Sequence, residues 1–279
     1  GRFLVITIEK VPYRKGHRYF VKGDERVDPA LPLVSCSTAA RHADSGGDGL
    51  QYWAAGLALA TGKKGAFKES NEKAIAIGND LHAEIEEHIA TGEQPKNPSA
   101  LFGAWYSSMQ ERGIEWLASE LKLYHPDLLY AGQCDAIGIV DDEVTLFDWK
   151  TTNGLDKDGK RKRLKHPNHA TQVGGYWLAL SRDRFEALQL HPYTQPGGYW
   201  PFTTSNQDQD MVKSPIPNVV GYAAPDAPEL PIPTRVVICY VLKDTLKVEW
   251  RYINPYPAAR AFIASLDVYN STKESLLYE

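Results

Sequence analysis

The alternation of apolar and polar positions is clearest between Leu129 and Thr152, where two β-branched runs flank the acidic pair Asp141 and Asp142. Two such runs around a short polar turn predict a β-hairpin. If the two aspartates form a two-residue turn, Val140 faces Glu143 across it. That pairing then sets the register of both strands.

Toward the open end of the hairpin, this register brings Asp135 opposite Asp148. Lys150 lies on the same face, because side chains two residues apart on a strand point the same way. Nearer the turn the face is apolar and is expected to join the core; it carries Ile137, Ile139, Val144 and Leu146. Two carboxylates beside a core face need a neutralising partner. A hard divalent cation provides one, and an adjacent lysine then suits phosphodiester hydrolysis.

Periodicities on both sides of the hairpin predict the remaining elements. We expect helices at about 48–61, 67–90, 99–119, 168–181 and 257–269, and strands at 120–125, 236–243 and 247–253. Alternation over 3–11 and 17–27 predicts an N-terminal hairpin. We therefore divide the chain into an N-terminal hairpin and helical elaboration, residues 1–66, and a core, residues 67–279. The core carries a Pro- and Gly-rich insertion at about 191–234, which is too long for a plain connection.

One histidine falls on the apolar face of the helix at 67–90. Gly78, His82 and Ile85 follow one another at steps of four and three residues, which places them on the same side of the helix. His82 is then either a satisfied core histidine or a ligand that faces the sheet. The missing side chain at Gly78 would let the helix pack close to the sheet.

Composition and charge narrow the possible functions. A chain of 279 residues with 43% hydrophobic residues has enough apolar material for a sizeable core. The net charge of -4 argues against a broad non-specific nucleic-acid binder but leaves room for a local basic groove. We see no membrane-spanning run and no secretory signal. The three cysteines are widely spaced and too few for an iron–sulfur cluster, so we expect none.

Three ordered motifs carry a resemblance to a known family. They are Gly132-Gln133-Cys134-Asp135, Asp148-Trp149-Lys150-Thr151, and Gln172 followed by Tyr176. The set G-x-x-D, D-x-K-T and Q-x-x-x-Y resembles the PD-(D/E)xK nucleases, and more closely their RecB-type exonuclease branch, which includes phage exonucleases and the mitochondrial genome maintenance exonuclease. The resemblance covers roughly residues 75–253. It implies an α/β restriction-endonuclease-like fold with a mixed central sheet flanked by helices.

The resemblance also implies roles for individual residues. A Mg²⁺ or Mn²⁺ ion would be held by His82, Asp135, Asp148 and the backbone carbonyl of Trp149. Lys150 would position or activate water, with Asp148, Asp135 and Glu120 completing the catalytic set. Glu120 matches an acidic position that such enzymes place before the hairpin, although a solvated glutamate at a strand end is nearly as good an interpretation. Gln172 and Tyr176 would line the site and grip the DNA.

A basic run follows the D-x-K-T motif. It contains Lys157, Lys160, Arg161, Lys162, Arg163 and Lys165. Its Gly content and charge predict a loop. It is either a solvated loop or a segment that contacts DNA phosphates, and its position beside the catalytic strand favours the second interpretation.

Together these features predict a divalent-metal-dependent DNA exonuclease that prefers single-stranded or frayed ends. A catalytically silent DNA-binding module on the same fold, a structure-specific endonuclease and a small-molecule hydrolase remain alternatives. The expected partner is DNA, and the expected compartment is the cytoplasm of a bacterial or phage-infected cell rather than a mitochondrion.

Overall fold

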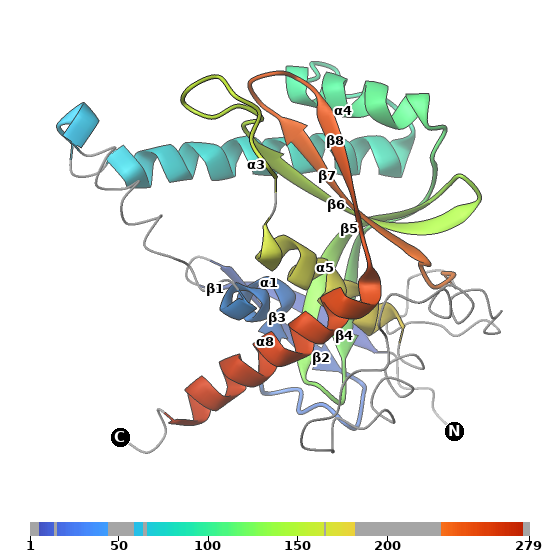
Figure 1. Cartoon of the computed structure of the whole chain (residues 1–279). Coiled ribbons are helices and arrows are strands. Elements are labelled where there is room, and N and C mark those ends of the chain that lie inside the picture. Colours follow the sequence, from blue (N-terminus) through green and yellow to red (C-terminus); the bar gives the residue numbers. More distant parts are fainter. Residues whose placement is uncertain are drawn as a thin grey trace.

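The computed structural model describes residues 6–13, 16–43, 59–63, 66–164, 166–181 and 230–275. Within these ranges six strands form one mixed sheet, and two more form a separate hairpin. Helices cover both faces of the sheet (Figure 1). The fold is therefore α/β, with a mixed sheet flanked by helices, as the sequence predicted.

The central hairpin consists of β5 (Tyr130–Val140) and β6 (Glu143–Thr152). Asp141 and Asp142 have positive φ angles of 52° and 61°, as in a two-residue type I′ turn. The predicted register is confirmed from Val140↔Glu143 as far as Ala136↔Phe147. Beyond that point the strands separate, so Asp135 and Asp148 are not a ladder pair.

Three of the described strands pair with the two edges of β5. β4 (Glu115–His125) pairs along one edge, antiparallel. On the other edge, β3 (Val34–Ser35) pairs in parallel with residues 130–131, and β6 pairs with residues 136–140. Residues 132–135 of β5 therefore lie between two pairings, at the place where the candidate site is built. The sheet continues from β6 to β7 (Arg235–Leu242) and then to β8 (Val248–Ile253).

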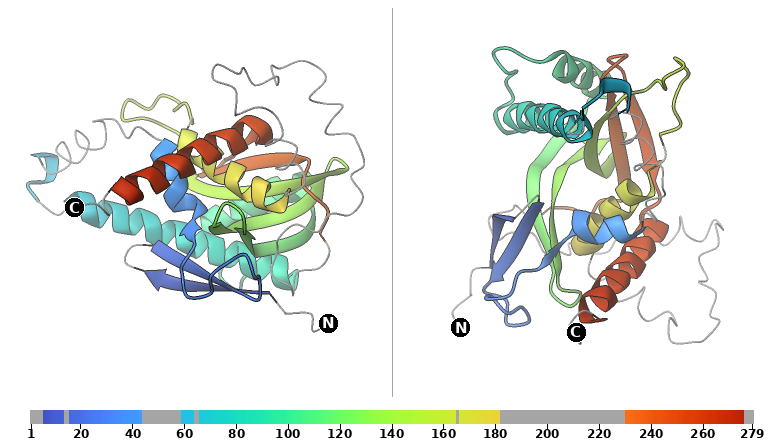
Figure 2. Two further views of the ribbon diagram at one scale, coloured as in Figure 1. Left: turned by 90° about the horizontal axis from the view of Figure 1, so that it is seen from below. Right: turned by 90° about the vertical axis from the view of Figure 1, so that its left-hand side faces the viewer.

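Two helical layers sandwich the sheet (Figures 1 and 2). One contains α3 (Ala66–Thr91) and α4 (Ala100–Glu111). The other contains α5 (Pro167–Leu180), α8 (Pro255–Ser275) and the short α1 (Cys36–Ala40), which is followed by a 3-10 turn, η1 (Arg41–Ala43). Alternate residues of β6 serve the two layers: Phe147 and Trp149 pack toward α3 and α4, and Leu146 packs toward α5 and α8. Asp148 and Lys150 share the face of Leu146.

The N-terminal hairpin is confirmed as β1 (Thr7–Tyr13) and β2 (Gly16–Lys22). Its apolar side chains form a small cluster with Tyr124 of β4 and Ala131 of β5. This cluster attaches the hairpin to the main sheet.

The prediction of a helix over 99–119 was wrong at its end. α4 ends at Glu111, and Trp116 and Leu117 lie on β4 instead. Gly113 adopts a φ of 59°, which a helix cannot continue, and the chain then pairs with β5. The last helix is longer than predicted and extends to Ser275.

Two predictions fall mainly on residues outside the described ranges. Of the helix expected at about 48–61, only residues 59–61 are described, and they are helical. Of the insertion expected at about 191–234, only residues 230–234 are described, and they lead into β7.

Candidate metal centre

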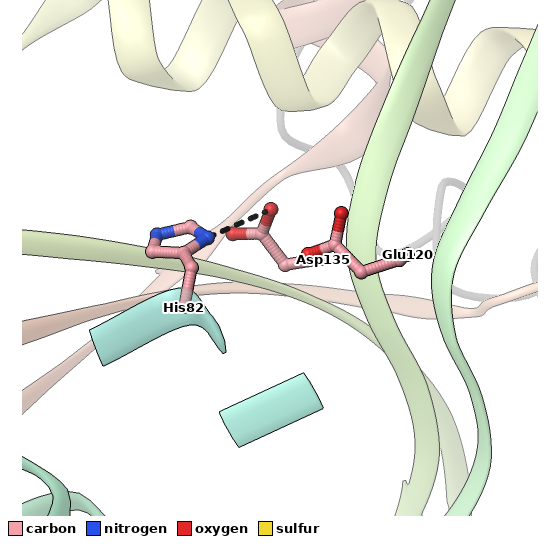
Figure 3. A group of neighbouring side chains, drawn as sticks. All are labelled: His82, Glu120 and Asp135. Atoms are coloured by element: carbon pink, nitrogen blue, oxygen red, sulfur yellow. Dashed lines mark ion pairs between the residues drawn. The ribbon is translucent and has the colours of Figure 1, made fainter. Parts of the chain in front are cut away.

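Three potential metal ligands converge beside residues 132–135 of β5, the stretch that pairs with β4 on one edge and with neither β3 nor β6 on the other. His82, Glu120 and Asp135 each offer one ligand atom, and these atoms all lie within 4.8 Å of one another (Figure 3). They come from α3, β4 and β5, and each residue is half-buried. Two carboxylates and one imidazole form a donor set that could hold a divalent metal ion.

The local backbone explains why the two carboxylates meet. Ser119 pairs with Ala136 and Leu121 with Cys134, so Glu120 on β4 lies across from Asp135 on β5. Glu120 has a positive φ of 50°, which interrupts the regular alternation of its strand. Cys134 packs toward α5, whereas Ala136 packs toward α3, so β5 also changes face at Asp135. The irregularity therefore aims both acids at the same space.

The carboxylate of Asp135 also stabilises the opening of the hairpin. Its Oδ2 accepts a hydrogen bond of 2.7 Å from the backbone N–H of Trp149. Where β5 and β6 separate, the Asp135 side chain thus accepts the hydrogen bond that a backbone carbonyl would accept in a regular sheet. The site keeps Asp135 close to β6 without a regular pairing between Asp135 and Asp148.

The helix α3 brings His82 over the hairpin. A Cβ at Gly78, one turn earlier, would lie 3.4 Å from Oγ1 of Thr151 on β6, so this face of α3 runs in ordinary contact with the strand. His82 Nε2 lies 3.2 Å from the carbonyl oxygen of Trp149, and Nδ1 lies 3.6 Å from Oδ1 of Asp135. If Nε2 carries the proton and donates it to the carbonyl, Nδ1 presents its lone pair to the carboxylates. Coordination of a metal ion through Nδ1 requires this tautomer.

Asp148 and Lys150 form a buried ion pair beside this group. The Lys150 Nζ lies 2.7 Å from Asp148 Oδ2, with the two side chains 21% and 1% exposed. Burial raises the pKa of Asp148 to about 6, against the opposing effect of Lys150 and with a further contribution from Asp135. Burial alone would lower the pKa of Lys150, but Asp148 and Asp135 outweigh it, and the net shift is upward. Asp148 lies outside the group of three ligands, and its role as a ligand stays a prediction.

Within the part of the chain that the structure describes, the ion pair with Lys150 leaves one carboxylate oxygen of Asp148 unsatisfied. Among the described residues, Asp148 Oδ1 is buried and has no hydrogen-bond partner. A buried carboxylate oxygen is costly unless something satisfies it. A cation nearby would offset this cost, and the ligand atoms of His82, Glu120 and Asp135 could hold a divalent one.

The surroundings of Glu120 disfavour its charged form. Burial, followed by repulsion from Asp135, raises the pKa of Glu120 to about 7, although His82 opposes the shift. Gln133 donates a hydrogen bond from Nε2 to Glu120 Oε2, and Lys10 of β1 donates one of 2.8 Å to Gln133 Oε1. Neither Lys10 nor Gln133 was predicted from the sequence to be a functional residue. Gln133 lies within the G-x-x-D motif and gave a weak signal, whereas Lys10 gave none.

Gln172 and Tyr176 line the α5 side of the same region. They are hydrogen-bonded to each other at 2.6 Å, from Gln172 Nε2 to the tyrosine hydroxyl. A Cβ at Gly132 would lie only 2.6 Å from the Tyr176 ring and 2.9 Å from Cys36 Sγ. The glycine of the G-x-x-D motif is therefore required by this close approach. Whether the pair contacts DNA stays a prediction.

The basic run forms a compact turn directly after β6. Leu155 and Arg161 form a β-bridge, and the Asp156 carboxylate accepts backbone hydrogen bonds from Asp158 and Lys160. Arg161 forms an ion pair of 3.0 Å with Glu249 on β8. The basic side chains from Lys157 to Arg163 are exposed, and Lys165 lies outside the described residues. The run is thus an ordered basic surface next to Lys150, and its contact with phosphates stays a prediction.

Comparisons with known proteins do not identify the chain. No family model matches it, and no curated protein matches it. A solved structure described as the crystal structure of SSO0001 aligns over 84% of this chain and 75% of its own, with 12% identity and a TM-score of 0.32. That similarity is too low to support an inference about fold or function. None of the described helices is long and apolar enough to cross a membrane.

Proposed function

We propose that this chain is a divalent-metal-dependent deoxyribonuclease of the PD-(D/E)xK superfamily, in its RecB-type exonuclease branch. The observation that carries the proposal is the convergence of His82, Glu120 and Asp135 beside the buried Asp148–Lys150 pair. From His82 to Lys150 these residues span 68 positions and follow the order typical of the family.

The proposed metal site uses oxygen donors mainly. Glu120, Asp135 and His82 Nδ1 would hold Mn²⁺ or Mg²⁺, and Asp148 Oδ1 is a further oxygen donor nearby. The Trp149 carbonyl would accept the Nε2 proton of His82 and so orient the imidazole, in place of the ligand role expected from the sequence. The bound ion would polarise the scissile phosphate and lower the pKa of a water molecule.

Lys150 performs the second part of the proposed reaction. Its ammonium is held by Asp148 at 2.7 Å and remains 21% exposed, so it can reach a substrate. There it would position the attacking water and offset the negative charge that develops on the phosphate. The exposed basic turn from Lys157 to Arg163 would bind the phosphates of the neighbouring nucleotides.

We propose attack on DNA from an end, with a preference for single strands. The helix α3 lies over the metal ligands through His82 and over β6 through Gly78, which favours a threaded strand over an intact duplex. A single strand also avoids the free-energy cost of unpairing bases near the site.

The test uses linear single- and double-stranded DNA labelled at either end, with Mg²⁺, Mn²⁺ or EDTA. We expect metal-dependent shortening of the linear single strand, slower attack on blunt duplex and little attack on circular single strands. Lys150→Ala should abolish cleavage, whereas Lys96→Ala, an exposed control on a loop, should leave it unchanged. Metal-dependent binding without cleavage by the parent protein would favour the silent module, and rapid linearisation of circles would favour an endonuclease.

A further inference from the structure

The N-terminal hairpin reaches the candidate metal centre through two successive hydrogen bonds, from Lys10 to Gln133 and from Gln133 to Glu120. Lys10 projects from the middle of β1, where it lies opposite Tyr19 of β2. Its Nζ donates to Gln133 Oε1 at 2.8 Å, and Gln133 Nε2 donates to Glu120 Oε2. The contact between Lys10 and Gln133 joins residues 123 positions apart, and both residues are half-buried.

The chemistry of the three side chains determines which atom of each one donates and which accepts in these hydrogen bonds. An ammonium group has only donors, so Lys10 can bind only the oxygen end of the Gln133 amide. The amide NH₂ is then left on the side of Glu120, where it donates to a carboxylate oxygen. Without Lys10 only the Glu120 carboxylate would hold the amide, which could then rotate away from it. Lys10 therefore fixes the far end of Gln133 in the orientation that Glu120 requires.

A fixed Glu120 matters because its position on β4 is irregular. Its positive φ of 50° removes the ordinary constraints of the strand from this residue. Gln133 donates to Oε2 of the Glu120 carboxylate, which leaves Oε1 of Glu120 to coordinate a metal ion. Hydrogen-bonding partners of this kind orient metal ligands, and their loss commonly lowers metal affinity by 10- to 100-fold.

We propose that Lys10 and Gln133 are positioning residues of the metal centre, in which Lys10 orients the Gln133 amide and Gln133 orients the Glu120 carboxylate toward His82 and Asp135. This inference rests on the proposed metal site. It makes the N-terminal hairpin a functional part of that site, in addition to the core that contributes the ligands themselves.

The hairpin does not depend on Lys10 for its attachment. Ile8, Tyr19 and Val21 are buried with Tyr124 and Ala131 of the sheet, and this apolar cluster would survive a change at Lys10. Loss of the lysine should therefore affect the metal site more than the fold. A matched control exists in Lys22 of β2, whose side chain is 60% exposed and pairs with Glu9.

The experiment measures Mn²⁺ binding to the full metal-free chain by calorimetry and by the electron paramagnetic resonance signal of free Mn²⁺. Lys10→Met should weaken Mn²⁺ binding by about 10- to 100-fold, while Lys10→Arg, which keeps the donors, restores it to within a few-fold. Lys22→Met removes the same charge from the same hairpin and should bind as the parent does. Gln133→Leu should weaken binding as Lys10→Met does, and the double variant should be no weaker than Gln133→Leu alone.

The variant His82→Ala distinguishes a wrong metal site from a wrong positioning role. If it binds Mn²⁺ as tightly as the parent, the metal site itself is wrong. If it binds weakly while Lys10→Met and Gln133→Leu match the parent, the positioning role alone is overturned. Should Lys10→Met fail to fold, Gln133→Leu decides between the same two results, because its change lies at the other end of the contact.

Discussion

Glu120→Gln offers a direct measure of the electrostatic cost of the metal-free site. The substitution keeps the size of the side chain and removes its charge, and the new amide oxygen can still accept a hydrogen bond from Gln133. Burial and the nearby Asp135 raise the pKa of Glu120 from 4.5 to about 7. Folding therefore favours the protonated form, and the native state binds more protons than the unfolded state between these pH values.

The sign and size of the effect follow from this difference. The free energy of unfolding contributed by Glu120 falls as the pH rises from about 4.5 to about 7 and is constant above that. At 1.36 kcal/mol per pH unit the whole shift corresponds to roughly 3 kcal/mol. Solvent screening of a half-buried group reduces this to about 2 kcal/mol. For a chain of this size, Glu120→Gln should raise the melting temperature by about 4 °C at pH 8 and leave it nearly unchanged at pH 4.5.

Thermal unfolding in EDTA measures this, with Glu115→Gln as the control. Glu115 lies on the same strand, β4, but is exposed, so its substitution should have little effect at either pH. With saturating Mn²⁺ at pH 8 the parent should instead melt at a higher temperature than Glu120→Gln, because the parent gains the free energy of metal binding and the variant largely loses it. An equal melting temperature of parent and Glu120→Gln at pH 8 in EDTA would refute the electrostatic reasoning.

Further predictions concern the other residues of the site. Lys150→Ala should reduce cleavage to background in a labelled-strand assay while DNA affinity in the presence of metal stays within several-fold, and near-parental turnover would contradict its role. His82→Ala should weaken Mn²⁺ binding measured by calorimetry with only a small loss in melting temperature, whereas a collapse of stability with intact binding would indicate a core histidine. Lys162→Gln should make the dependence of log affinity for single strands on log salt shallower by about 0.7, and an unchanged slope would exclude a phosphate contact. Gly132→Ala should destabilise the protein by about 1–3 kcal/mol in a denaturant titration, since the added Cβ overlaps the Tyr176 ring, and unchanged stability would show that the ring moves freely.

The parts of the fold that the sequence predicted well depend on local patterns. The β5–β6 hairpin was predictable because its turn residues, alternation and register all lie within 24 positions. The helix at 99–119 was misjudged because Trp116 and Leu117 happen to continue its apolar spacing. The signal that ends it is Gly113, whose φ of 59° can be anticipated from residue type but not established without the structure.

The candidate site was predictable where its residues belong to a motif or to a periodic pattern. Asp135, Asp148 and Lys150 follow from the hairpin, and His82 from the face of its helix. Glu120 was harder to assign, because its position depends on the pairing of β4 with β5 and on a backbone angle of 50°. Lys10 could not be found, since its contact with Gln133 is non-local and a lysine on a strand is otherwise unremarkable in sequence.

The helix α8 has a consequence for the order in which the site can form during folding. Ser265 near the end of the chain donates a hydrogen bond to the carbonyl of Ala39, and α8 packs so closely on α5 that a Cβ at Gly174 would overlap the backbone of Ala258. α8 therefore helps to hold α1, and with it β3, against β5 beside the candidate ligands. A folding chain in which α8 has not yet packed onto α5 lacks this support. The candidate site should accordingly become complete only once α8 has docked, although α8 contributes none of its three potential ligands.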